Sequence, residues 1–274
     1  MTFEPRVALA SLSGQSDAEW ARAGSEFAGA AFLGGVALDE KSRAAARKLV
    51  ERDREEFLPE DPLAFVAAEL DALADAPLRP AVNVRSATLS PVREAARLCA
   101  ERDAMLEINA HCRQAELCAV GCGETLLRDT DRLAEYVAAA AEEGAAVSVK
   151  VRAEVEGVDL AETARAVASA GADAIHVDAM DSEAVVRDVA DAAPGLFVLA
   201  NNEVRDAESV REYLDYGADA VSVGRPSTDP RVLRRVRDAV EGWFAESNAE
   251  HPNADESNTD ESNADGSNAG GVAK

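Results

Sequence analysis

The stretch AVSVKVRAEVEGVDLAETARAVASAGADAIHV (146–177) decides the fold class of this chain. It begins with one apolar run, AVSVKV (146–151), and ends with another, DAIHV (173–177). Between them, DLAETARAVASAGA (159–172) has the 3.6-residue apolar spacing of a helix, opening on Asp and closing near Gly. The stretch therefore reads as strand, helix, strand, and strands this continuously apolar are typical of a parallel sheet covered on both faces.

The same unit recurs along the chain. Six further apolar runs are RVALASL (6–12), GAAFLGGV (29–36), PAVNV (80–84), MLEIN (105–109), LFVLA (196–200) and DAVSV (219–223). Further helical patterns are DTDRLAEYVAAAAEEG (129–144), DAESVREYLDYGA (206–218) and DPRVLRRVRDAVEGWF (229–244). Eight strands alternating with helices predict an α/β (β/α)8 TIM barrel over residues 1–245, with an open doubly wound sheet as the alternative. In a barrel of this kind the active site lies on the loops that follow the strands.

Residues 246–274 differ in composition, with DESN-type repeats and no apolar periodicity. They are expected to form a disordered, low-complexity acidic tail without a catalytic role. The whole chain carries 52 Asp and Glu against 28 Lys and Arg, a formal net charge of −24. We interpret this balance as adaptation to a halophilic, high-salt interior. At 1 M salt, charges are screened over a distance of roughly 3 Å, which would weaken the repulsion between this acidic protein and nucleic acid.

The sequence also sets expectations about compartment. No apolar run is long enough to span a bilayer, and the first residues lead into a strand rather than a signal peptide. We therefore expect a cytoplasmic protein with no membrane partner. Its four cysteines, Cys99, Cys112, Cys118 and Cys122, are not expected to form disulfides in that compartment.

The loop after the fourth strand carries the main chemical signal, EINAHCRQAELCAVGCGETLLRD (107–129). It places Asn109 at the strand end and Cys112 three residues later. A protonated thiol there can act as a general acid, because an ordinary cysteine titrates near pH 8.5. Two other readings remain open: a packing cysteine, or a metal site with Cys118 and Cys122. The spacings of five and three intervening residues match no common zinc or iron–sulfur pattern.

This segment resembles the active-site motif of the dihydrouridine synthases, in which an Asn, a Cys, a glycine pair and a Leu-Leu recur at fixed spacing. The matching residues are Asn109, Cys112, Gly121, Gly123, Leu126 and Leu127. Further segments follow the family's order: LASLSGQSD (9–17), PAVNV (80–84), VKVR (149–152), LANNEV (199–204) and VGR (223–225).

The resemblance implies an FMN-dependent oxidoreductase that reduces a uridine C=C in tRNA with NAD(P)H, with Cys112 as the proton donor. It also implies that Asn109 and His111 bind substrate. From the cysteine spacing, we expect no metal site. Residues implied to bind FMN are Ser11, Leu12 and Ser13 beneath the ring, Asn83 and Lys150 at its edge, and Asn201, Asn202, Gly224 and Arg225 at the phosphate.

The chain departs from the family pattern around these residues. The family has Gly before the Cys and Pro after it, where this chain has His111 and Arg113. The histidine of the family's sixth strand aligns with Asp178, and His176, two residues earlier, is expected to be a satisfied barrel histidine. A basic residue that the family uses for RNA is replaced by Glu116.

Alternatives follow from these departures. The substrate could be a free pyrimidine or another small conjugated molecule instead of tRNA. Lys150 could form a Schiff base in an aldolase or isomerase with Asp178 or Glu107 as acid/base, and a scaffold role is a third possibility. If RNA binds, we expect a basic rim at the mouth made by four arginines, hereafter the arginine rim: Arg85, Arg113, Arg152 and Arg205.

Overall fold

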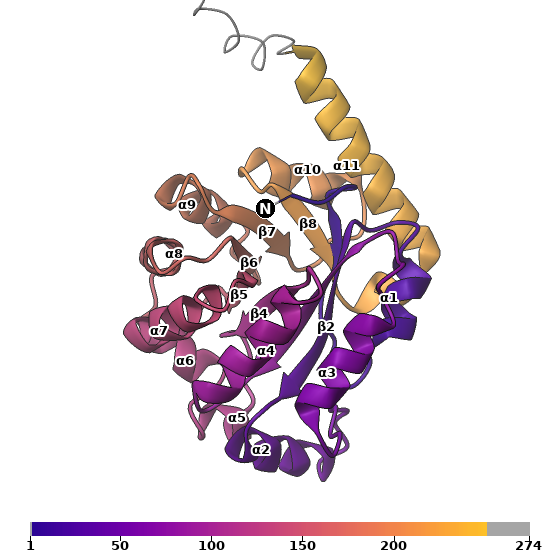
Figure 1. Cartoon of the computed structure of the whole chain (residues 1–274). Coiled ribbons are helices and arrows are strands. Elements are labelled where there is room, and N and C mark those ends of the chain that lie inside the picture. The colour runs from indigo at the N-terminus through magenta and orange to yellow at the C-terminus, as the bar shows by residue number, and fades with distance from the viewer. Residues whose placement is uncertain (1, 251–274) are drawn as a thin grey trace, which may run out of the picture.

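Eight parallel strands close into a barrel in the computed structural model, which describes residues 2–250 (Figure 1). The strands are β1 Val7–Leu9, β2 Ala30–Ala37, β3 Arg79–Arg85, β4 Met105–Asn109, β5 Ala146–Arg152, β6 Ala174–Asp178, β7 Phe197–Asn201 and β8 Ala220–Val223. Each strand pairs with its neighbour in sequence, and β1 also pairs with β8, which closes the sheet. All eight predicted strands are confirmed, and the open doubly wound sheet is excluded.

Helices surround the barrel (Figure 1). They are α1 Ala18–Gly24, α2 Glu40–Val50, α3 Pro62–Asp71, α4 Ser90–Ala100, α5 Ala115–Cys118, α6 Glu124–Arg128, α7 Thr130–Ala141, α8 Leu160–Ser169, α9 Val185–Ala192, α10 Ala207–Asp215, the 3-10 turn η1 Arg225–Thr228 and α11 Pro230–Glu250. Aspartates cap several helix starts with their side chains, accepting backbone N–H bonds that would otherwise lack a partner. These caps are Asp17, Asp39, Asp61, Asp129, Asp159 and Asp206.

The C-terminal boundary differs from the prediction. Helix α11 continues to Glu250, so the first five residues of the expected tail, 246–250, are helical. Ser247 Oγ donates to the carbonyl of Trp243 at 3.0 Å, and extending an existing helix by a turn costs little because its nucleus has already formed. Residues 251–274, the rest of that predicted tail, lie outside the described residues.

The barrel interior has an apolar floor and a polar upper part. A cluster of buried side chains from seven strands fills the end nearest the strand N-termini, including Ala8, Phe32, Met105, Ala174 and Phe197. Because side chains alternate along a strand, the inward positions two and four residues further on reach the other end of the barrel. Those positions are polar and buried, and they include Asn83, Glu107, Ser148, His176 and Ser222. Polar groups are therefore concentrated towards the mouth.

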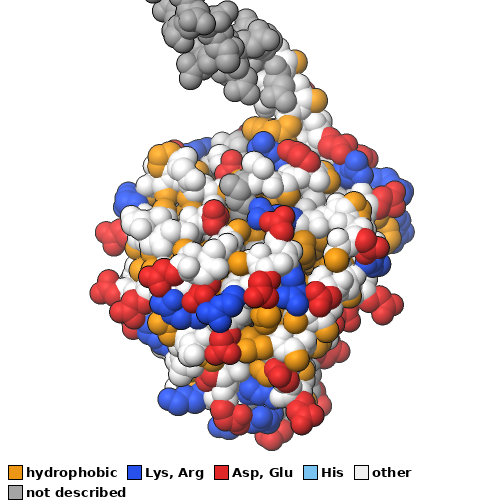
Figure 2. Space-filling view, in the orientation of Figure 1, with side chains coloured by type: hydrophobic (Ala, Val, Ile, Leu, Met, Phe, Trp, Pro, Cys, Tyr) orange, Lys and Arg blue, Asp and Glu red, His pale blue; other side chains and the backbone are white. Residues whose placement is uncertain are grey.

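The outer surface is mixed in charge. Figure 2 shows acidic and basic side chains interspersed over the face in view, so the excess of acids is spread out rather than gathered there in one patch. Within residues 2–250, no helix combines the length and the apolar content needed to cross a membrane.

Candidate active site

The mouth of the barrel brings together polar side chains from consecutive strands. Strand register sets Asn109 of β4 beside Lys150 of β5, and Arg152 of β5 beside Asp178 of β6. Asp178 in turn lies beside Asn201 of β7. Asn109, Lys150, Arg152 and Asp178 are all at least nine-tenths buried, so their charges and dipoles act across a space with little water.

The loop after β4 is held by the side chain of Asn109. Its Oδ1 accepts the backbone N–H of His111 at 3.2 Å and that of Cys112 at 3.0 Å. The carbonyl of Cys112 then accepts the N–H of Glu124 at 2.8 Å, which ties the loop to the start of α6. Asn109 thereby fixes the position of the thiol relative to the strand end.

Gly123 is required by this arrangement. Its φ is +60°, and a Cβ there would lie 2.0 Å from the carbonyl oxygen of Cys112. Any side chain at this position would break the contact between the loop and α6. The glycine of the sequence motif is thus explained by the close approach of two backbone segments.

The thiol of Cys112 lies in an electropositive setting. Burial raises its pKa, but the Arg85 charge and the neighbouring His111 outweigh burial and lower the pKa to about 7. Arg85 is itself paired with the buried Glu56 at 2.5 Å, and Glu56 opposes the lowering of the thiol pKa. A thiol titrating near neutrality is suited to proton transfer.

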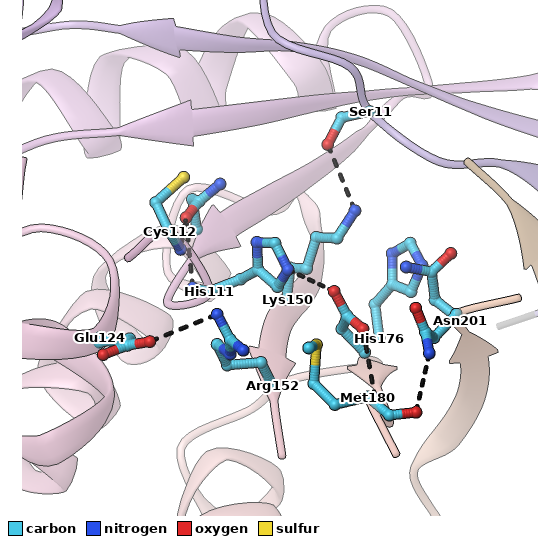
Figure 3. Close-up of polar contacts among 12 residues, drawn as sticks. Ser11, His111, Cys112, Glu124, Lys150, Arg152, His176, Met180 and Asn201 are labelled. Atoms are coloured by element: carbon cyan, nitrogen blue, oxygen red, sulfur yellow. Dashed lines mark hydrogen bonds and ion pairs between the residues drawn. The ribbon is translucent and has the colours of Figure 1, made fainter. Parts of the chain in front are cut away.

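Lys150 brings a second positive charge to the mouth. Its side chain is 4% exposed, and Figure 3 shows it reaching towards Ser11, with Nζ 3.5 Å from the hydroxyl oxygen. No carboxylate within residues 2–250 forms an ion pair with it. A buried ammonium without an acidic partner fits a site that receives negative charge from a bound group.

The turns after β7 and β8 form the opposite side of the mouth. Asn202 and Glu203 have φ of +108° and +51°, and the Tyr213 hydroxyl donates to the Asn202 carbonyl at 3.0 Å. A Cβ added at Gly224 would meet no atom within 4 Å, so the space over this backbone is open. Arg225 is exposed there and has no ion-pair partner in the described part of the chain. Backbone and guanidinium donors beside an open space suit a phosphate.

Comparison with known proteins identifies the family. The family model described as "Dihydrouridine synthase (Dus)" matches residues 73–257. This match spans more than half of the chain and includes the Cys112 loop, Lys150 and the turns after β7 and β8. The chain belongs to the dihydrouridine synthase family. It is therefore an FMN-dependent oxidoreductase rather than a non-flavin aldolase or isomerase.

One sequence relative and two solved structures are similar to this dihydrouridine synthase family member, and the two solved structures share its fold. An uncharacterized protein of Methanocaldococcus jannaschii is 25% identical over 235 residues, covering 81% of this chain and 89% of the relative. The structure of DHODH from Eimeria tenella in complex with ferulenol superposes with a TM-score of 0.66 at 15% identity, over 91% of this chain and 84% of that one. A FabK variant from Thermotoga maritima has a TM-score of 0.55 at 16% identity, over 82% of this chain and 62% of FabK.

The residues present fit a flavin. Lys150 supplies a buried positive charge, and Gly224 and Arg225 supply an open, donor-rich turn about where a TIM barrel holds phosphate. Ser11 and Ser13 are part-buried on the first loop, where Ser11 approaches Lys150 and Ser13 accepts a hydrogen bond from Arg85. The Leu12 N–H donates to Ser16 Oγ at 2.9 Å, which fixes the turn between the two serines.

The amide of Asn83, a residue that the resemblance implies to bind FMN, is engaged by other side chains. It is fully buried, its amide NH2 donates to Glu107 at 2.7 Å, and its Oδ1 accepts from Asn109 at 2.8 Å. Both ends of the amide are therefore engaged inside the barrel. Arg85, two residues further along β3, contacts Glu56 and Ser13.

A chain of hydrogen bonds continues from Asn83 across the barrel. Glu107 accepts from His176 Nδ1 at 2.7 Å, and His176 Nε2 lies 2.7 Å from the Ser222 hydroxyl. The Ser222 hydroxyl oxygen also lies 2.9 Å from Asn201 Oδ1. Both ring nitrogens of His176 are thus engaged, which confirms the prediction of a satisfied barrel histidine. We call the linked residues the barrel polar chain: Asn109, Asn83, Glu107, His176, Ser222 and Asn201.

The arginine rim is largely neutralised by acids. Arg85 pairs with Glu56 at 2.5 Å and Arg205 with Glu203 at 3.0 Å. Figure 3 shows Arg152 turned towards Glu124, at 3.4 Å, although its Nε has no hydrogen-bond partner. Arg113 is exposed and forms no ion pair with the residues described. Three of the four rim arginines are therefore paired with carboxylates, and Arg113 is not.

Sequence reasoning did not find three features of the site. They are the Arg85–Glu56 pair beside the thiol, the His111–Asp178 contact at 2.5 Å, and the short helices α5 and α6 inside the predicted loop. The cysteine-metal alternative also lacks support, since no group of three His, Cys, Asp or Glu side chains among the described residues is placed to hold a metal ion.

Proposed function

We propose that this protein is a tRNA-dihydrouridine synthase that uses NAD(P)H to reduce a uridine C=C, with Cys112 supplying the proton. The observation that carries the proposal is the position of Cys112. Asn109 fixes its backbone at 3.0 Å on the mouth of the barrel, and its pKa is about 7. A family member with a titratable thiol at this place has the group that reduction of a C=C requires.

FMN, when bound, supplies the hydride, and the protein supplies binding, orientation and the proton. Lys150 would face the flavin ring, where its charge stabilises negative charge that builds up on reduction. Asn201, Asn202, Gly224 and Arg225 would hold the phosphate. Asn109 and His111 would contact the pyrimidine. One carbon of its C=C would receive the hydride and the other would receive the Cys112 proton, which leaves a C–C single bond.

A second candidate substrate is a small pyrimidine or another small conjugated molecule. The observation favouring it is the neutralised arginine rim, where Arg85, Arg152 and Arg205 each pair with a carboxylate. RNA affinity depends on cations that are free to replace the counterions of phosphates. A small substrate needs no such surface.

Dihydrouridine mapping in tRNA tests the proposal. We expect a strain lacking this gene to lose dihydrouridine at one or more tRNA positions, and wild-type protein to restore it. Complementation with Cys112→Ala should fail, whereas Cys118→Ala should succeed. Unchanged dihydrouridine in the deletion strain would refute the tRNA substrate and favour the small-molecule reductase.

A further inference from the structure

Helix α2 lies beside the Cys112 loop at the mouth of the barrel. One cluster of buried side chains joins the helix to this loop: Ala45, Leu49, Cys112, Leu117 and Cys122. Figure 1 shows α2 next to α5, at the end of the barrel towards which β2 runs. The exposed face of α2 is therefore next to the route by which a substrate reaches Cys112.

The segment that contains this helix is basic, although the chain as a whole has a net charge of −24. Residues 41–54 contain six lysines and arginines and only two acids, Glu51 and Asp53. Lys41 and Lys48 are both exposed. They are seven residues apart and so lie on the same side of the helix, about 10 Å from each other along its axis. Lys150, the third lysine of residues 2–250, is buried, so α2 carries both exposed lysines of the described chain.

Four exposed cations at this entrance form no ion pair with residues 2–250. We call them the entrance cations: Lys41, Lys48, Arg54 and Arg113. Two other arginines of the segment are neutralised. Arg47 pairs with Glu40 at 2.8 Å, and Arg52 pairs with Glu116 of α5. An exposed cation without an acidic partner is free to take the place of the counterions of a phosphate.

The turns after β5, β6 and β7 carry the opposite charge. They contain seven acids and a single base: residues 153–159, 179–184 and 202–206. That base, Arg205, pairs with Glu203 at 3.0 Å, whereas acids such as Glu154 and Asp181 are exposed. A polyanion is attracted to one side of the mouth and repelled from the other, and this charge pattern favours a single orientation of the bound molecule.

We propose that the exposed face of α2, with Arg54 and Arg113, is the surface on which the phosphate backbone of an RNA substrate docks. The backbone then follows the mouth on the side of α2 and α5, away from the acidic turns, with one base directed to Cys112. This inference rests on the proposed function, because it takes RNA as the substrate. It also supplies free cations for RNA next to an arginine rim in which three of four members are paired with carboxylates.

The test is the binding of tRNA by full-length protein that lacks three entrance cations. The α2 variant combines three substitutions: Lys41→Gln, Lys48→Gln and Arg54→Gln. Glutamine is a good helix former, so α2 should remain folded. The probe is an unmodified tRNA transcript, and filter binding measures its dissociation constant. The measurement covers a series of potassium chloride concentrations at which circular dichroism shows every protein to be folded.

A matched control removes the same positive charge from the outer helices α8, α9 and α11. It combines three substitutions of exposed arginines that form no ion pair with residues 2–250: Arg165→Gln, Arg187→Gln and Arg234→Gln. The control and the α2 variant have the same net charge. A difference between them therefore reports where the charge lies and not how much charge the protein carries.

Loss of three phosphate contacts should change the salt dependence of binding. The slope of log K against log salt should become shallower by about two to three units in the α2 variant, since each contact contributes about 0.7–0.9. At the lowest salt the transcript should bind this variant roughly tenfold or more weakly. The control should keep the wild-type slope and bind within about twofold of wild type, because charges beyond a screening length act weakly. Flavin content and flavin reduction by NAD(P)H should be the same in all three proteins.

A wild-type slope and affinity in the α2 variant would overturn the inference. An equal loss in the α2 variant and the control would also overturn it, since net charge would then be the cause. If wild type binds phosphatidylglycerol vesicles through α2 but does not bind the transcript, the surface belongs to a membrane and not to RNA.

Dihydrouridine content judges the proposed function separately. A weakened α2 variant, together with a wild type that makes no dihydrouridine, would support the RNA surface and refute tRNA reduction. Dihydrouridine formation together with unchanged binding by the α2 variant would support the proposed function and refute the surface.

Discussion

Replacing Glu107 with alanine should severely destabilise the barrel. The Glu107 carboxylate is fully buried and accepts hydrogen bonds from His176 at 2.7 Å, Asn83 at 2.7 Å and Ser148 at 3.4 Å. Burial raises its pKa, but His176, Lys150 and Asn83 outweigh burial and lower it, so the group is an anion. Its removal leaves three buried polar groups without their acceptor.

Each buried polar group left without its hydrogen-bond partner costs roughly 1–3 kcal/mol, so losing the acceptor of three donors should lower the unfolding free energy by roughly 3–5 kcal/mol. For a domain of about 250 residues each kcal/mol shifts the melting temperature by about 2–4 °C, so Glu107→Ala should melt roughly 6–20 °C lower. Calorimetry and urea unfolding at molar salt measure the two quantities. Glu135→Ala, on the exposed face of α7, is the control and should change the unfolding free energy by less than about 0.5 kcal/mol.

A Glu107→Ala protein as stable as the Glu135→Ala control would refute this reasoning. It would mean that the barrel polar chain is not held together by this carboxylate. Glu107→Gln tests the charge alone, since it keeps the shape and one acceptor. We expect it to be less destabilising than Glu107→Ala, because at least one of the three donors keeps a partner.

Three further predictions concern the cofactor, pH and the other cysteines. Arg225→Ala should weaken FMN binding roughly 10–100-fold, the effect of losing one charge-assisted hydrogen bond, and fluorescence titration measures this affinity. The control is Arg231→Ala, which removes an exposed arginine paired with Asp229 and should bind FMN like wild type. Burial lowers the pKa of His176, so the imidazole is neutral in the native state. The unfolded chain binds a proton at this histidine below about pH 6.5, and the free energy of unfolding therefore decreases as the pH falls below that value. His176→Asn should therefore depend less on pH between 5 and 6.5, and a steeper dependence would contradict the assignment. Cys122→Ala should keep flavin and turnover, since burial raises the pKa of this thiol to about 12, and a loss comparable to that of Cys112→Ala would argue against a unique role for Cys112.

Much of the barrel could be predicted because its signals are local. The apolar runs that became β4 to β8 lie within a residue or two of the observed strands, and the aspartates before several helices cap them as expected. Asn109 and Cys112 were also predictable, since their spacing is fixed by two hydrogen bonds within one loop. The helices α5 and α6 were missed because four or five residues show no helical period.

The rest of the site depends on pairs that are distant in sequence. Arg85 and Glu56 are separated by 29 positions, and His111 and Asp178 by 67. No spacing rule connects such residues before the barrel closes. The resemblance implied that Asn83 binds FMN, and the structure shows its amide bonded to Glu107 and Asn109 inside the barrel. The pattern of apolar residues in a strand does not show how far a side chain reaches inside the barrel, or which side chains it contacts there.

The most direct measurement is the pair of half-reactions in wild type and Cys112→Ala, followed by stopped-flow absorbance of the flavin at molar salt. NAD(P)H should reduce the flavin at similar rates in both proteins, because Cys112 takes no part in that step. Reoxidation by a uridine-containing tRNA transcript should be about 10²–10⁴-fold slower in Cys112→Ala, the loss expected for a missing general acid. Equal reoxidation rates in the two proteins would contradict the assignment of Cys112 as the proton donor.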